Sequence, residues 1–218
     1  MNHMESDYLI RNEETKDMRE VEELTRKAFW NLSVPGCNEH YLVHIMRNHP
    51  DFIKELAFVL EKDGIIIGNI MYTKAKLIDD HGFEKQILTF GPVCILPMYQ
   101  RMRYGKSMLE HSFTKAKEMG YDTIVIYGNP DNYVSRGFKS CKRYNICIKN
   151  DYFPAPMLVK ELKEGCLDGR KWHYIESDVY HIDETAAEQF DSGFEKMEKK
   201  IKPSQEEFYI HSHSQIID

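Results

Sequence analysis

A stretch in the middle of the chain combines an apolar run, three cations and the start of a helical pattern. It extends from Gly91 to Leu109, and it contains Arg101, Arg103 and Lys106 but no acidic residue. The first turn of a helix leaves backbone N–H groups unpaired and carries the positive end of the helix dipole, so phosphate oxygens bind there favourably. Because the whole chain has a net charge of -6, this local excess of positive charge predicts a site for a diphosphate.

A nucleotide-binding P-loop is the nearest alternative for this stretch. Gly105-Lys106-Ser107 matches the end of the Walker A motif. That motif also needs a glycine earlier in the loop so that the backbone can wrap around the phosphates, and Gln100 stands at that place. The spacing therefore disfavours a P-loop.

The stretch instead resembles the acetyl-CoA site of GNAT-family N-acetyltransferases, in which a strand ending in V-x-P precedes Q/R-x-x-G-x-G/A at the start of a long helix. Ile95, Pro97, Gln100 and Gly105 fit this pattern. Arg103 departs from it, because the family has a glycine there that lets the main chain approach phosphate. The departure implies either a loop that bends differently or a guanidinium that contacts a phosphate.

A second segment supports the same resemblance. After the apolar run of residues 122–128, Tyr133 and Gly137-Phe138 match the family's Y-x-x-x-G-F ending. The lead-in GNPDNY is similar to the G-D-P-x-Y-Y variant of a bacterial branch of predicted acetyltransferases, with Asn129 and Asn132 substituted. The two segments follow each other in the family's order, separated by the length of one helix.

This resemblance implies an acetyl-CoA-dependent N-acetyltransferase, which transfers an acetyl group directly to a primary amine of a small molecule or a protein. A main-chain N–H of Cys94 or Ile95 would donate to the thioester oxygen. Tyr133 would protonate the leaving thiolate, since a phenol with a pKa of about 10 is un-ionised at neutral pH. The residues expected to bind the cofactor are Val93, Cys94, Ile95, Gln100, Arg101, Met102, Arg103, Tyr104, Gly105, Lys106, Ser107, Asn129 and Asn132.

Several roles stay open at this level. Asn129 and Asn132 lie in a Pro-containing turn, where asparagine is favoured for local reasons as well as for binding a ligand. A base for the acceptor ammonium is not identified; six residues could reach the acceptor pocket, namely Glu39, His40, His44, Asp79, Asp80 and His81. Two alternative functions are a CoA-binding sensor or interaction protein without turnover, and transfer of a longer acyl group.

Composition and hydrophobic pattern indicate one large α/β (α+β) unit. The chain has 218 residues, of which 42% are hydrophobic and 29% charged, as is ordinary for a globular protein. Alternation and turn signals predict a mixed central sheet of about seven strands flanked by helices. The resemblance assigns residues 1–162 to the acetyltransferase domain and residues 163–218 to a C-terminal extension packed on it.

The expected strands cover residues 8–11, 56–60, 65–72, 86–95, 122–128, 144–148, 157–162 and 172–175. Helices are predicted around Val21–Phe29, after Asn38, from Arg103 to Met119, and from Asp183 to Lys200, where acidic residues come first and lysines last.

The cysteines, the histidine pair and the net charge limit the possible partners and the location of the protein. Five scattered cysteines without a C-x-x-C or His/Cys cluster predict reduced thiols and no metal site, and packing is the favoured role of Cys94. His211 and His213 form an H-x-H pair in what reads as a solvated tail. The acidic net charge disfavours nucleic acid, no apolar run could span a membrane, and residues 1–7 lack the pattern of a signal peptide. We therefore expect a cytoplasmic protein, and a homodimer is compatible with the sequence.

Overall fold

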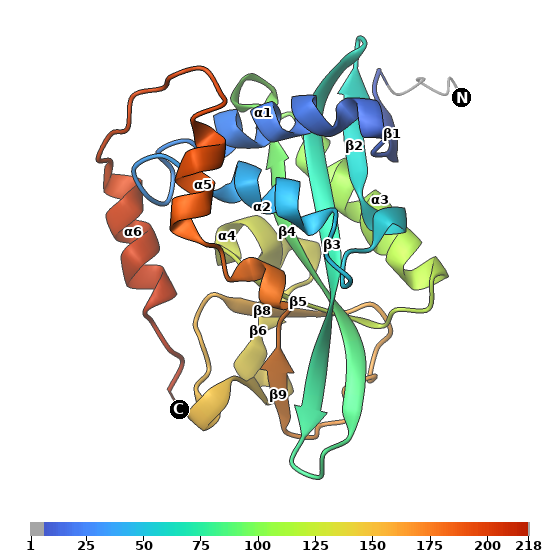
Figure 1. The fold of residues 1–218 in the computed structure, drawn as a ribbon. Coiled ribbons are helices and arrows are strands. Elements are labelled where there is room, and N and C mark those ends of the chain that lie inside the picture. The colour runs from blue at the N-terminus through green and yellow to red at the C-terminus, as the bar shows by residue number, and fades with distance from the viewer. Residues whose placement is uncertain (1–6, 218) are drawn as a thin grey trace.

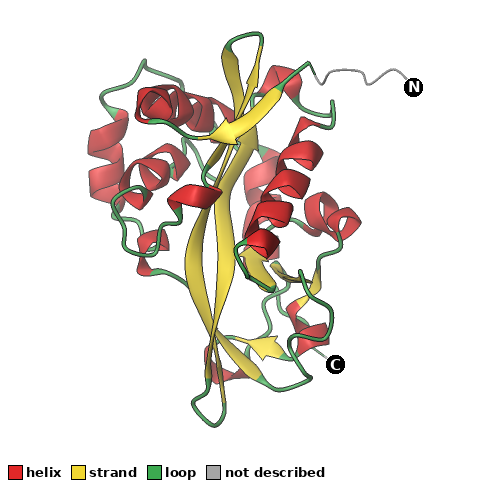
Figure 2. Cartoon of the chain, turned by 90° about the vertical axis from the view of Figure 1, so that its right-hand side faces the viewer, coloured by secondary structure: helices red, strands yellow, loops and turns green. Residues whose placement is uncertain are grey.

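A long twisted sheet runs through the centre of the molecule, with helices on both of its faces (Figures 1 and 2). The structure, a computed structural model, describes residues 7–217. Residues 1–6 and residue 218 lie outside the described part. The expectation that residues 1–7 are not a signal peptide therefore concerns a segment that lies mostly outside it. Within residues 7–217 no helix is long and apolar enough to cross a bilayer.

The sheet is mixed, as the sequence predicted. Its main path runs β1-β2-β3-β4-β5-β8-β6, while β9 pairs with both β3 and β7. Within the described residues, seven strands lie on this path, as expected, and two more, β7 and β9, pair outside it. The strands are β1 (Leu9–Asn12), β2 (Phe58–Lys62), β3 (Ile65–Asp79), β4 (Glu84–Ile95), β5 (Thr123–Tyr127), β6 (Lys139–Ser140), β7 (Ile146–Cys147), β8 (Met157–Glu161) and β9 (Trp172–Ile175).

The sheet opens between β4 and β5. These two parallel strands are in register only at Leu88 and Ile124. Beyond that point β4 continues to Ile95, whereas β5 ends at Tyr127. The C-terminal part of β4 therefore presents one edge that β5 does not cover.

A bulge lies in the uncovered part of β4. Ile70 is opposite Val93 and Tyr72 is opposite Phe90, so two residues of β4, Gly91 and Pro92, face one residue of β3. Proline cannot donate to the ladder, which explains why the irregularity falls there.

The helices divide between the two faces. α1 and α2 pack with Val59, Met71 and Cys94 on one face. α3 packs with Ile70 and Tyr72 on the other. The helices are α1 (Met18–Phe29), α2 (Glu39–Met46), α3 (Tyr104–Glu118), α4 (Pro130–Tyr133), α5 (Glu184–Asp191) and α6 (Pro203–Ser212). Short 3-10 helices are η1 (Thr15–Asp17), η2 (Lys54–Leu56), η3 (Pro97–Tyr99), η4 (Val134–Arg136), η5 (Cys141–Tyr144), η6 (Lys149–Asp151) and η7 (Asp178–Tyr180).

The single helix predicted from Asp183 to Lys200 is wrong in its second half. Asp183 does cap α5, and its carboxylate accepts from the N–H groups of Thr185 and Ala186. The helix then ends at Asp191, because the backbone beyond it bonds elsewhere: the Asn31 side chain donates to the carbonyl of Glu198 and accepts from the N–H of Lys200. The segment that reads as a solvated tail contains α6, which begins with Pro203 at its first turn.

Candidate active site

The cationic turn lies where β4 leads into α3. Arg103 is the N-cap residue of α3 and has a φ of 69°. This is the left-handed region that glycine enters freely and that costs other residues about 1–2 kcal/mol. The backbone at Arg103 thus has the conformation that a glycine would adopt, and the substitution keeps the turn while adding a guanidinium.

The first turn of α3 is open to an anion. Among the described residues no side chain caps it, and it contains no acidic residue. Arg101, Arg103 and Lys106 are exposed beside it. Only Lys106 has an ion-pair partner in the described part of the chain, at 3.5 Å from Glu110. Tyr104 differs, because its ring is buried in a T-shaped contact with Tyr8, so only its backbone N–H faces the turn.

The backbone of Ile95 faces the open edge of β4. The Gln100 side chain donates to the Ile95 carbonyl at 2.9 Å, whereas the N–H of the next residue, Leu96, donates to Ile67 of β3 at 2.8 Å. In an antiparallel ladder the N–H and C=O of one residue point to the same side, and neighbours alternate. The N–H of Ile95 therefore points away from β3, and that of Cys94 points toward it. Of the two donors left open by the sequence, the geometry favours Ile95.

The Cys94 thiol is part of the packing on the α1 and α2 face. Its Sγ lies 2.9 Å from Asn69 Oδ1 and 3.9 Å from Thr25 Oγ1. Burial raises the pKa of this thiol to about 12. A thiol held protonated in this way is a poor nucleophile.

Tyr133 sits at the end of α4 with its ring against Phe90 and Phe138, at centroid separations of 5.9 and 5.6 Å. Burial raises the pKa of its phenol to about 12, and its hydroxyl bonds to no described residue. Gly128 leaves the space that this ring occupies, because a Cβ there would lie 2.5 Å from Tyr133 Cε2. Sequence reasoning missed Gly128 because the clash is set by how β5 meets α4.

Asn129 and Asn132 occupy the turn before and within α4. The Asn129 side chain caps the helix by accepting from the N–H of Asp131 at 3.0 Å. Asn132 is exposed, its backbone N–H donates to the Asn129 carbonyl, and its side chain bonds to no described residue. The hydrogen bond from the N–H of Asp131 supports the interpretation of Asn129 as a turn-forming residue.

A group of polar side chains that the sequence did not single out covers the other face of the β4 bulge. The Tyr180 hydroxyl, from η7, donates to the Gly91 carbonyl at 3.3 Å. Burial raises the pKa of Tyr127, Tyr174 and Tyr180, and the negative charge of Glu176 adds to each rise. Burial raises the pKa of Glu176 itself. No sequence motif marks these residues, because β9 and η7 come near β4 only through the tertiary fold.

Four of the six residues considered as an acceptor base have side chains that bond to other described residues. His40 lies 3.1 Å from Asp191 and His44 lies 3.0 Å from Glu22. Asp79 accepts from the backbone N–H groups of His81 and Phe83, which form the turn between β3 and β4, and Asp80 pairs with His173. The His81 ring bonds to no described residue. Glu39 accepts from the N–H of Asn38, and burial raises its pKa.

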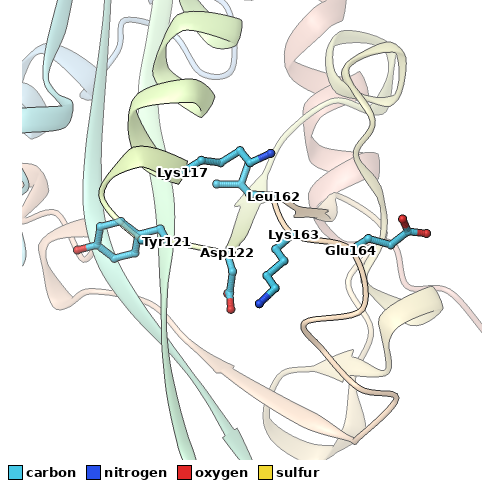
Figure 3. A pocket seen from close by; sticks show the side chains of 7 residues that line it. Lys117, Tyr121, Asp122, Leu162, Lys163 and Glu164 are labelled. Atoms are coloured by element: carbon cyan, nitrogen blue, oxygen red, sulfur yellow. The ribbon is translucent and has the colours of Figure 1, made fainter.

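A surface hollow lies away from the cationic turn. Figure 3 shows it at the C-terminal end of α3, lined by Lys117, Gly120, Tyr121, Asp122, Leu162, Lys163 and Glu164. A helix of this length separates its two ends by about 20 Å. The hollow is therefore distinct from the cationic turn, and it faces helix carbonyls instead of N–H groups.

Comparison with known proteins agrees with this arrangement. Residues 16–140, more than half of the chain, match the model of the Acetyltransferase (GNAT) family. The uncharacterized N-acetyltransferase YjhQ of Escherichia coli (strain K12) is 22% identical over 111 residues, which are 51% of this chain and 58% of that relative. The chain thus spans little more than half the length of this curated relative.

Two solved structures share the fold. The GNAT-family N-acetyltransferase YhbS of Escherichia coli, in complex with CoA, superposes with a TM-score of 0.70 at 20% identity, over 81% of this chain and 93% of that one. A GNAT-family acetyltransferase from Brucella melitensis, in complex with acetyl-CoA, gives 0.62 at 19% identity, over 79% and 97%. Taken with the match over residues 16–140, the open first turn of α3 and the gap between β4 and β5, these findings show that the chain belongs to the GNAT family of acetyltransferases.

Proposed function

We propose that the protein is an acetyl-CoA-dependent N-acetyltransferase that transfers the acetyl group directly to a primary amine. The observation that carries this is the uncapped first turn of α3, flanked by Arg101, Arg103 and Lys106, beside the open edge of β4. The CoA diphosphate would accept from the backbone N–H groups of that turn and from the two guanidinium groups. Both solved relatives with this fold were crystallised with CoA or acetyl-CoA.

Two groups of this chain serve the transfer step. The N–H of Ile95 points out of the sheet where β5 has ended, and it would stabilise negative charge on the thioester oxygen; removing one such donor costs about 2.7–4 kcal/mol in measured cases. The phenol of Tyr133 carries its proton at neutral pH, since its pKa is raised to about 12. It would pass that proton to the departing CoA sulfur.

The acceptor side of the site is formed by Tyr127, Glu176 and Tyr180. Tyr180 packs on the face of the sheet that α1 and α2 cover, opposite α3 and Tyr133. Tyr127 contacts Tyr174, with ring centroids 6.1 Å apart. A carboxylate in this setting attracts an ammonium ion, and its raised pKa brings it nearer to that of an effective general base. We therefore place the amine beside Glu176, whether it belongs to a small molecule or to a protein.

Free thiol release measures the activity. Purified protein is incubated with acetyl-CoA and a panel of small amines and lysine-containing peptides, and CoA-SH is followed with a thiol reagent. We expect release that depends on one class of amine and that falls roughly 10²-fold in Glu176→Gln. Tight CoA binding without amine-dependent release would instead support the alternative of a CoA-binding sensor.

Two coarser properties complete the proposal. The cysteines Cys37, Cys94, Cys141, Cys147 and Cys166 are all free thiols, which supports a reducing compartment, and we propose the cytoplasm. The division at residue 162 and the homodimer stay predictions. Light scattering on the purified chain measures its oligomeric state.

A further inference from the structure

Three side chains that are far apart in the sequence meet at the end of the sheet remote from the cofactor turn. They are Cys147 of β7, Asp151 of η6 and His173 of β9, and their ligand atoms all lie within 4.8 Å of one another. Figure 1 shows β9 beside the far end of the β3–β4 hairpin. The whole length of β4 separates this cluster from Ile95.

The backbone fixes the cluster. Cys147 and His173 are direct partners in the parallel pairing of β7 with β9. The N–H of Ile148 donates to the Tyr152 carbonyl at 2.9 Å, which closes the loop and returns Asp151 to Cys147. The three donors are therefore held by sheet register and a closed turn.

The spacing fits a tetrahedral ion. Cys147 Sγ lies 3.5 Å from His173 Nδ1 and 3.9 Å from Asp151 Oδ1. An ion bound at about 2.3 Å from sulfur and about 2.0–2.1 Å from nitrogen, with a tetrahedral angle between them, requires these two atoms to be about 3.6 Å apart. The sulfur and nitrogen are already at that separation, and a small rotation of Asp151 brings its oxygen into place.

The imidazole is also oriented for an ion. His173 Nε2 lies 3.0 Å from Asp80 Oδ1. A carboxylate only accepts hydrogen bonds, so Nε2 carries the proton and Nδ1 keeps a lone pair toward Cys147 and Asp151. A carboxylate behind a histidine is the usual second partner of a metal-binding imidazole.

From this geometry we propose that Cys147, Asp151 and His173 bind a divalent ion of the zinc class, with a water in the fourth position. Thiolate and imidazole favour Zn²⁺ or Co²⁺ over Mg²⁺ and Ca²⁺, which take oxygen ligands. The ion would tie β9 and the β3–β4 hairpin to the loop after β7. This replaces the expectation of no metal site, which rested on the absence of a Cys/His motif in the sequence.

One neighbour competes with the ion. Lys171 Nζ lies 2.7 Å from Asp151 Oδ1. It neutralises the carboxylate when no ion is bound, and its positive charge repels a divalent cation. Lys171→Met should therefore strengthen metal binding, an effect that a purely structural role of the cluster would not produce.

The test is a Co²⁺ titration of the chelator-treated full-length protein, followed by displacement with Zn²⁺. We expect one ion per chain and a thiolate-to-cobalt charge-transfer band, which Cys147→Ser and His173→Ala abolish and the control Cys166→Ser retains. Asp80→Asn should weaken binding about 10–100-fold, and Lys171→Met should tighten it.

Circular dichroism of the ion-free variants shows that each is folded. No charge-transfer band in the wild-type protein would overturn the proposal, as would a band that survives Cys147→Ser. Binding that Lys171→Met leaves unchanged or weakens would also overturn it. None of these results depends on acetyl transfer, so the proposed enzymatic function stands or falls separately.

Discussion

At the scale of single residues, Tyr133 carries the most direct prediction. Tyr133→Phe removes only a hydroxyl that bonds to no described residue, so the ring contacts with Phe90 and Phe138 stay. We expect kcat to fall roughly 10²-fold while the Kd of acetyl-CoA is unchanged. Single-turnover kinetics and calorimetry measure the two quantities, and an unchanged kcat would remove Tyr133 from its role.

Gly128→Ala tests the same residue without touching the phenol. The added Cβ would meet the Tyr133 ring at 2.5 Å and must displace it. We expect kcat to fall while the fold remains, as judged by circular dichroism. Gly64→Ala serves as the comparison: at a φ of 77° it strains only its own turn, and its Cβ meets nothing within 4 Å, so kcat should stay unchanged.

The pH dependence of kcat/KM follows from two groups. As the proposed base, Glu176 must be deprotonated to accept a proton. Because its pKa is raised, we expect activity to be lost as pH falls through a value above the ordinary range of glutamate. Tyr133 must be protonated, and with a pKa near 12 it causes no loss between neutral pH and about pH 10. Glu176→Gln should remove the acidic limb; a limb that persists unchanged would show that another group is the base.

At the scale of elements, the turn before α3 explains how an arginine replaces the expected glycine. The left-handed φ of Arg103 costs about 1–2 kcal/mol, while glycine loses about 0.5–1 kcal/mol in entropy on folding. Arg103→Gly should therefore change the free energy of unfolding by about 1 kcal/mol or less and weaken acetyl-CoA binding. Urea unfolding and calorimetry separate the effects, and unchanged binding would show that the guanidinium does not reach a phosphate.

Local pattern was enough to predict the elements that build this site. The strand into Ile95, the helix from Tyr104 and the short strand Trp172–Ile175 all follow from alternation, helical spacing and turn residues. The helix to Lys200 was wrong because its backbone bonds to Asn31, a partner far away in the sequence. Two further features could be assigned only from the tertiary structure. Strand register decides that Ile95 and not Cys94 presents its N–H at the open edge, and ring packing decides that Gly128 leaves space for Tyr133.

At the scale of the whole molecule, the segment after residue 162 completes the core and contributes residues to the proposed acceptor face. Trp172 is 1% exposed, and its indole N–H donates to the Leu167 carbonyl at 3.1 Å. Trp172→Ala should lower the free energy of unfolding by about 3–5 kcal/mol. Ile175, on the same strand, is 49% exposed. Ile175→Ala should therefore lower the free energy of unfolding by less than about 1 kcal/mol. Equal effects of the two variants in urea unfolding would contradict this packing.

In the proposed mechanism the two faces of the sheet bind different substrates. α3 and α4 hold the side on which the cofactor would bind, while α2 and η7 hold the side on which Glu176 and Tyr180 would meet the amine. The opening between β4 and β5 connects the two sides. The central claim is that the first turn of α3 binds the diphosphate of acetyl-CoA.

Calorimetry of acetyl-CoA binding at low and high salt tests that claim most directly. Lys106→Glu reverses a charge at the first turn of α3, and Lys115→Glu makes the same change of charge in the last turn of the helix. We predict that Lys106→Glu weakens binding roughly tenfold at low salt and less at high salt, because exposed charges are screened, while Lys115→Glu binds as the wild type does. Wild-type affinity in Lys106→Glu, or equal losses in both variants, would contradict the account.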